Sequence, residues 1–252
     1  MAGKLYFASD FHLGIPDYAS SLVREKRLVA WLEQIRHDAE AIYLMGDVFD
    51  FWFEYRRVVP KGFTRLLGKL SEITDSGVPV HLFRGNHDIW AFRYLEEECG
   101  LILHREAEFL CHDGKVFYLV HGDGKGPGDY GYKFLKWIFE CRINQWLLGC
   151  VHPNLGIGMG LFFSRRSRYA NVVKEQKQEV LMPIVDAALY HHAEEVVAAH
   201  PEVDYCIFGH YHRPVTEPLP GGGTFVLLGD WLVHFTYGVY EKGTFRLEKF
   251  CD

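Results

Sequence analysis

The sequence has no pair of cysteines at C-x-x-C spacing, no excess of basic residues and no uninterrupted apolar run long enough to cross a membrane. Its six cysteines are scattered through 252 residues, which argues against a zinc ribbon or a disulfide framework and favours reduced thiols in a cytosolic protein. The net charge of −6 argues against a dedicated nucleic-acid binder, which needs a basic face. The N-terminus runs directly into a β-like segment without an apolar signal region, so we expect no export by that route.

Two further features of known protein classes are missing. The uncharged stretch 143–164 is the nearest approach to a membrane span, but polar residues interrupt it and glycines dilute it, so we expect it to be interfacial or buried. The glycine-rich stretch 122–131 lacks the G-x-x-x-x-G-K-[ST] pattern, so no cradle for a nucleoside triphosphate is expected.

The composition that remains is that of a globular α/β protein. With 48% hydrophobic and 24% charged residues the chain can bury a sizeable core. Residues 22–36 and 63–74 show helical periodicity, and Glu25 is expected on the polar face of the first of these helices. Six short apolar runs have the length of buried strands: residues 5–8, 41–45, 80–83, 116–120, 205–208 and 225–228.

Residues 125–174 differ from the rest of the chain in charge. They hold eight basic and two acidic residues, a net charge of +6 in a chain of −6, together with many bulky apolar side chains. Such a segment is suited to an anionic membrane surface, where each basic residue contributes about 1 kcal/mol. The alternative is a lid whose apolar residues pack on the core.

Histidines and carboxylates gather at the ends of the predicted strands. Imidazole nitrogen and carboxylate oxygen bind divalent cations, and a two-metal site needs one carboxylate that bridges both ions. One such block alone would indicate a solvated loop, whereas five in succession predict a metal site along one edge of the fold. The five blocks are Asp10-x-His12, Gly46-Asp47-x-x-Asp50, Gly85-Asn86-His87-Asp88, His121-Gly122-Asp123 and Gly209-His210-x-His212.

These blocks resemble the calcineurin-like metallophosphoesterase superfamily, whose pattern is D-x-H, G-D-x-x-D, G-N-H-D/E, a later histidine and G-H-x-H. The resemblance implies an α/β fold, a double β-sheet sandwich flanked by helices, although the strand pattern alone would equally fit a single doubly wound sheet. It also implies one domain, 1–252, with an inserted helical cap at about 125–200. The implied activity is that of a metal-dependent phosphoric ester or pyrophosphate hydrolase.

The resemblance further implies two divalent metal ions. One would be bound by Asp10, His12, Asp47 and His212, and the other by Asp47, Asn86, His121 and His210, with Asp47 as the bridge. The donor set suits manganese, iron or zinc, and the resemblance favours manganese.

Two other residues of the blocks are the expected catalytic pair. His87 lies beside the ligand Asn86, and the resemblance implies that it contacts the substrate phosphate or protonates the leaving oxygen, oriented by Asp50.

Within the superfamily the chain is similar to the UDP-2,3-diacylglucosamine pyrophosphohydrolases of lipid A biosynthesis. The similarity lies in residues 7–13, 46–52 and 209–214, in the segment from His121 through Tyr132, and in Leu228-Gly229-Asp230-Trp231. The best-known branch of that family has G-N-R-D where this chain has Gly85-Asn86-His87-Asp88, which places this chain in a divergent branch.

This similarity implies a substrate, a location and a set of contacts. The products would be UMP and 2,3-diacylglucosamine 1-phosphate, formed from a glycolipid nucleotide by a cytoplasmic enzyme peripheral on the anionic cytoplasmic face of the inner membrane. No nucleic-acid partner is expected, and the oligomeric state stays open. The predicted substrate contacts are Asp123, Asp129, Arg166, Asn171 and Lys174.

Two other functions remain open at this point. One is a soluble metallophosphoesterase acting on another nucleotide, phosphodiester or phosphoprotein, which would need no acyl chains. The other is a non-enzymatic scaffold that keeps the metal site for structure or protein binding. The complete ligand set argues against the scaffold.

Overall fold

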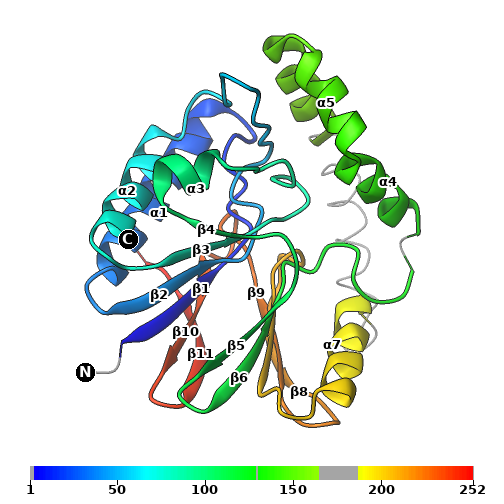
Figure 1. Cartoon of the computed structure of the whole chain (residues 1–252). Helices are drawn as coiled ribbons and strands as arrows, with labels where there is room; N and C mark the ends of the chain where they lie inside the picture. The colour runs from blue at the N-terminus through cyan, green and yellow to red at the C-terminus, as the bar shows by residue number, and fades with distance from the viewer. Residues whose placement is uncertain (1–2, 129, 165–186, 252) are drawn as a thin grey trace.

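The computed structural model describes residues 3–128, 130–164 and 187–251, and it contains two β-sheets with helices on their outer faces (Figure 1). The first sheet has the strand order β11-β10-β1-β2-β3-β4 and the second the order β5-β6-β7-β9-β8. Strands β1 to β4 pair in parallel, whereas β10 pairs antiparallel with β1, so the first sheet is mixed. The strands of the first sheet are β1 (Lys4–Ala8), β2 (Ala39–Leu44), β3 (Val80–Phe83), β4 (Ile102–His104), β10 (Thr236–Glu241) and β11 (Thr244–Lys249). Those of the second are β5 (Glu108–His112), β6 (Lys115–Leu119), β7 (Tyr205–Phe208), β8 (Pro214–Pro218) and β9 (Thr224–Leu228).

Alternating side chains divide each central strand between two cores. In β1, Leu5 and Phe7 lie in the cluster between the sheets, whereas Tyr6 and Ala8 lie in the cluster on the outer face. The second sheet behaves in the same way, because Phe117 of β6 faces the first sheet while its neighbours face outward. This two-sided burial explains why the strands read as continuous apolar runs, and the predicted sandwich is confirmed.

Helices cover both outer faces of the sandwich. The first sheet is covered by α1 (Tyr18–Ile35), α2 (Thr64–Asp75) and α3 (Tyr94–Cys99), and the second by α7 (Ala188–Ala199) (Figure 1). The helix α7 lies inside the range 125–200 that the sequence indicated as an insertion, yet it packs on the second sheet through Leu189, Ala193 and Val197. Its apolar side chains therefore belong to the sandwich.

One sequence expectation about α1 is wrong. Glu25 does not lie on a solvent face: it is buried, and its Oε1 accepts hydrogen bonds from the backbone N–H groups of Arg65 and Leu66 at 2.9 and 3.2 Å. These are orphan donors at the start of α2, whose own N-cap, Phe63, makes no side-chain hydrogen bond. The carboxylate of one helix thus caps the next, a long-range contact that helical periodicity cannot reveal.

The insertion helices are α4 (Tyr130–Glu140), α5 (Arg142–Cys150) and the helical residues 153–164. In the part of the chain that the structure describes, α4 and α5 have no buried side chain. Figure 1 shows these helices projecting beyond the sheets. Among the described residues, no helix is both long and apolar enough to cross a membrane.

Candidate metal centre and active site

The predicted blocks meet at one edge of the sandwich. Because β1, β2 and β3 run parallel, as do β6 and β7, the loops that follow them leave from neighbouring positions. Those loops carry every predicted site residue that the structure describes: Asp10, His12, Asp47, Asp50, Asn86, His87, His121, Asp123, His210 and His212. The remaining predicted contacts, Asp129, Arg166, Asn171 and Lys174, lie outside the described residues.

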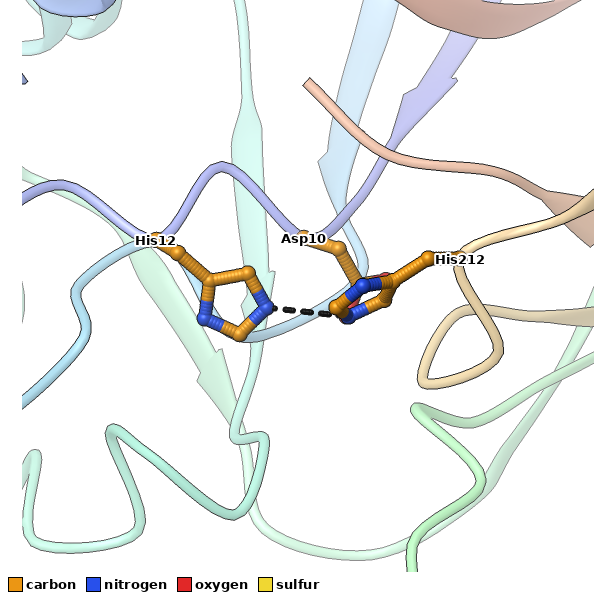
Figure 2. Close-up of side chains that lie close together, drawn as sticks. All are labelled: Asp10, His12 and His212. Atoms are coloured by element: carbon orange, nitrogen blue, oxygen red, sulfur yellow. Dashed lines mark hydrogen bonds and ion pairs between the residues drawn. The ribbon is translucent and has the colours of Figure 1, made fainter. Parts of the chain in front are cut away.

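Asp10, His12 and His212 form the first cluster at this edge (Figure 2). Asp10 Oδ1 lies 3.5 Å from His12 Nε2 and 3.4 Å from His212 Nε2. The two Nε2 atoms are themselves 3.2 Å apart, so both imidazole rings present a nitrogen to the same point. Three donors within this distance of one another can hold one cation.

A second cluster adjoins the first through Asp47. Asp47 Oδ2 lies 3.4 Å from His121 Nε2 and 3.8 Å from His12 Nε2, which places this carboxylate between the two groups of ligands. His210 lies beside His121, and its Nδ1 is 3.1 Å from Asn86 Oδ1. One carboxylate shared between two donor sets is the arrangement that a two-metal site requires.

Within the described part of the chain, two buried polar atoms of these clusters have no hydrogen-bond partner, which favours a bound metal ion at this site. Among the described residues, Asp10 Oδ1 and His121 Nε2 are buried without a hydrogen-bond partner. His121 Nδ1 donates to the backbone oxygen of Met45 at 2.7 Å, which leaves Nε2 as the ring nitrogen directed at the cluster. Buried polar atoms left unpaired are costly, and a bound cation would satisfy both.

The backbone of this edge is strained. Asp10, His12, Asp47 and His210 all have positive φ angles, between 44° and 65°. Residues other than glycine rarely adopt this region, and such strain gathers at functional sites. Gly85 has a related role: a Cβ there would overlap the Asp47 carboxylate, so only glycine lets the two loops approach.

The close packing of these groups shifts the pKa values of Asp47, His121 and His210. Burial opposes a charge on each, yet the neighbouring Asp47 raises the pKa of His121 to about 10. In turn His121 and His87 hold the pKa of the buried Asp47 carboxyl well below its usual range. By contrast burial, together with His121, lowers the pKa of His210 to about 4, so His210 is neutral and can donate a lone pair.

The edge of the sandwich that carries the two ligand clusters is called the metal edge below. His87 and Asp50 lie together next to it. His87 Nδ1 lies 2.9 Å from the backbone oxygen of Asp50, while its Nε2 is 4.0 Å from Asp47 Oδ2. Asp50 is fully buried and its Oδ1 is 3.7 Å from both His87 Nδ1 and His12 Nδ1. The geometry also groups His87 with His12 and Asp47 as potential ligands, a set that the sequence did not indicate.

Asp123 ties the insertion to the metal edge. Its Oδ2 accepts a hydrogen bond from the Tyr132 hydroxyl at 2.6 Å and pairs with Lys136 Nζ at 2.7 Å, both from α4. Trp90, in the loop after β3, makes a second link by donating from Nε1 to the Phe139 backbone oxygen at 2.9 Å. The insertion helices are therefore held directly beside the site.

Arg24 and Ser164 were missed by the sequence reasoning. Arg24, buried on α1, donates to the backbone oxygens of Phe11, His12 and Ile15 at 2.6–2.7 Å and so holds the loop that carries two candidate ligands. Ser164 approaches Asp50 and His87 from the insertion. An arginine among apolar helix positions was a usable signal for the first, but a single serine far along the chain gave none.

Comparison with known proteins agrees with this geometry. The family model described as calcineurin-like phosphoesterase matches residues 3–214. The chain belongs to this family. It is accordingly a metal-dependent hydrolase of the dimetal class, and the expected family is confirmed.

Curated relatives of this phosphoesterase carry one recurrent name. A UDP-2,3-diacylglucosamine hydrolase of Porphyromonas gingivalis is 40% identical over 100% of this chain and 99% of its own length. A protein of the same name from Shewanella baltica is 25% identical, with 96% of this chain and 91% of the relative covered. A solved archaeal phosphodiesterase aligns with a TM-score of 0.47 at 14% identity, covering 97% of this phosphoesterase and 98% of that chain.

Proposed function

We propose that this phosphoesterase hydrolyses the pyrophosphate bond of UDP-2,3-diacylglucosamine to UMP and 2,3-diacylglucosamine 1-phosphate. The full-length likeness to the Porphyromonas gingivalis protein carries the proposal, because it extends through the insertion as well as the metal edge. We also propose that the chain is one domain, 1–252, with the predicted insertion at about 125–200 as its cap, apart from α7, which packs on the second sheet.

The proposed ligands are those of the two clusters at the metal edge. Asp10, His12, Asp47 and His212 would hold one ion, and Asp47, Asn86, His121 and His210 the other, with manganese as the proposed metal. When bound, two divalent cations supply a water activated near neutral pH and positive charge for the phosphate oxygens.

The chain's own groups complete the reaction. His87 Nδ1 is engaged by the Asp50 carbonyl, so Nε2 is the nitrogen available to the substrate. From there it would bind the phosphate or give a proton to the leaving oxygen. Asp129, Arg166, Asn171 and Lys174 remain proposed contacts for the sugar and phosphates, with Asp123 as a further contact.

The insertion is the proposed site of the acyl chains and of membrane attachment. Its described helices expose large apolar side chains, among them Phe134, Trp137, Trp146 and Phe162. Contiguous exposed apolar surface marks an interaction site, and a basic apolar segment suits an anionic lipid face. We therefore propose a peripheral location on the cytoplasmic face of the inner membrane.

The decisive test is product analysis. Manganese-loaded protein is incubated with UDP-2,3-diacylglucosamine and, in parallel, with UDP-glucosamine, and the products are identified by mass. We expect UMP and the acylated sugar phosphate, formed far faster than any product of UDP-glucosamine. Equal rates on both substrates would contradict a lipid-specific enzyme and favour a general phosphoesterase.

Attachment is tested separately by sedimentation with anionic phosphatidylglycerol vesicles. Trp146→Glu is expected to reduce the bound fraction severalfold, because it places a charge on the exposed apolar surface. Val233→Glu is the matched control, since Val233 is equally exposed but lies outside the insertion. Equal binding of the two variants would contradict attachment through the insertion.

A further inference from the structure

Ser164 connects the insertion with the predicted catalytic pair. It is the last described residue of the helical stretch 153–164, and its hydroxyl oxygen lies 2.6 Å from Asp50 Oδ2 and 3.1 Å from His87 Nδ1. A carboxylate can only accept a hydrogen bond, so the Ser164 hydroxyl donates its hydrogen bond to Asp50. The lone pairs of the same oxygen are then free to accept from His87.

The orientation of the His87 ring follows from these partners. The Asp50 backbone oxygen, 2.9 Å from Nδ1, is also only an acceptor, so Nδ1 carries a hydrogen that Asp50 and Ser164 share. The opposite nitrogen, Nε2, points toward Asp47 Oδ2 at 4.0 Å. With Nδ1 held in this way, the ring cannot rotate about χ2 without losing two contacts.

The position of Ser164 is set by the packing of its own helix. Gly156, Gly160 and Ser164 are spaced four apart, so they share one helix face. A Cβ at Gly156 would overlap the Tyr55 hydroxyl, and one at Gly160 would overlap the Phe51 ring. Both aromatic residues belong to the loop that carries Asp50, so the two glycines bring the helix close enough for Ser164 to reach the carboxylate.

We propose that Ser164 is a positioning residue for the phosphoester hydrolysis. It fixes the His87 imidazole, directly and through Asp50, in the orientation that presents Nε2 to the substrate. This rests on the proposed function only in naming the substrate. As a consequence, the orientation of His87 depends on the packing of the helix 153–164 of the insertion against the loop of residues 51–55.

The first experiment compares Ser164→Ala with Ser164→Thr and with Ser71→Ala. Ser71 is a matched control, because it is a partly buried helical serine that bonds backbone oxygens of α2 and α3 away from the site. For Ser164→Ala we expect kcat to fall about 10-fold with KM within about twofold, the effect of one hydrogen bond to a charged group. Ser164→Thr should recover most of the rate, and Ser71→Ala should match the wild type.

A double-mutant cycle separates positioning from a merely structural role. If Ser164 acts through His87, then Ser164→Ala should cost little more than about twofold in a His87→Ala background. A full 10-fold loss there, or an unchanged kcat in the single variant, would overturn the proposal. Each variant is also checked for its unfolding midpoint, which we expect to remain close to that of the wild type.

Substitutions at two glycines of the helix 153–164 test the position of the helix independently of Ser164. Gly160→Ala would displace the helix from Phe51, so it should lower kcat as Ser164→Ala does. Gly158→Ala, where a Cβ meets nothing within 4 Å, should leave kcat within about twofold. Equal rates for the two glycine variants would contradict the role assigned to helix seating.

All variants are assayed on UDP-2,3-diacylglucosamine and on diphenyl phosphate, a soluble diester with a poor leaving group. If the wild type cleaves only the diester, the proposed substrate is wrong, yet the Ser164 comparison on the diester still tests positioning. If the wild type cleaves the lipid substrate and Ser164→Ala does so equally fast, positioning is wrong and the proposed function stands.

Discussion

The sandwich core and the insertion helices use the same bulky side chains in opposite ways. Trp31 and Trp231 are 0% exposed between the first sheet and its helices, whereas Trp137 and Trp146 of the insertion are 65% and 67% exposed. Both regions are rich in aromatic residues, so composition does not explain the difference. What differs is how far the rest of the described chain covers the rings, and under the proposed function the exposed set serves binding.

The largest expected effect comes from changing the site that lies between these regions. Asp47→Asn removes the carboxylate shared by both ligand clusters, so we expect activity to fall about 1,000-fold or more and the bound metal to decrease. Phosphodiester hydrolysis and elemental analysis of the purified protein measure the two effects. Asp113→Asn, in an exposed turn, is the control. Full metal content with wild-type activity in Asp47→Asn would remove Asp47 from the centre.

A pair of tryptophan variants tests the contrast itself. Trp31→Ala leaves a cavity in the core and should lower the free energy of unfolding by about 3–5 kcal/mol. Trp146→Ala removes an exposed ring and should change it by less than about 0.5 kcal/mol while weakening vesicle binding. Urea denaturation measures both. A large loss of stability in Trp146→Ala would show that the insertion is packed in solution.

The link between the two regions gives a smaller, local effect. Lys136→Met removes the cationic partner of the buried Asp123 carboxylate, so we expect hydrogen exchange in α4 to become about 10-fold faster, with exchange in β1 unchanged. Lys133→Met is the control, since Lys133 Nζ donates to the Gly126 backbone oxygen and lies over the Tyr130 ring, and pairs with no carboxylate among the described residues. Equal protection of α4 in Lys136→Met and the wild type would contradict the anchoring role of Asp123.

The smallest effect is the contribution of His81, in strand β3 of the sandwich, to the pH dependence of stability. Burial, with a contribution from His104, lowers the pKa of His81 from 6.5 to about 4. Between those values the unfolded chain binds more protons than the folded one, so stability should decline as the pH falls from about 6.5 to about 4. His81 is stacked on Tyr43 and contacts His104, which faces Glu108.

Denaturation midpoints at pH 7 and pH 5 measure this decline. His81→Gln should reduce the difference between them, whereas His37→Gln, at an exposed site on the first helix's C-terminal side, should leave it unchanged. An identical decline in His81→Gln and the wild type would assign the pH dependence to other groups.

Local sequence was sufficient for the central strands and for the residues at their ends. All six apolar runs became strands, because burial on both faces requires an unbroken run of apolar residues. Five strands, β4, β5, β8, β10 and β11, were not predicted. Strand β4 has only three residues, β5, β8 and β11 are partly exposed, and Gly238 interrupts the buried apolar side chains of β10. The blocks of predicted metal ligands were recognisable because each one directly follows a strand. The spacing of the ligands within a block is short and is therefore visible in the sequence.

The sequence by itself thus determined the family, through that resemblance the sandwich, and the supply of metal-binding side chains. Only the tertiary structure decided which groups share an environment: that Glu25 caps α2, that Arg24 holds the His12 loop, and that Ser164 meets Asp50. It also decided that the apolar insertion helices remain exposed. The physical reason is that periodicity and motif spacing record contacts within one element, whereas hydrogen bonds between distant elements depend on how those elements pack.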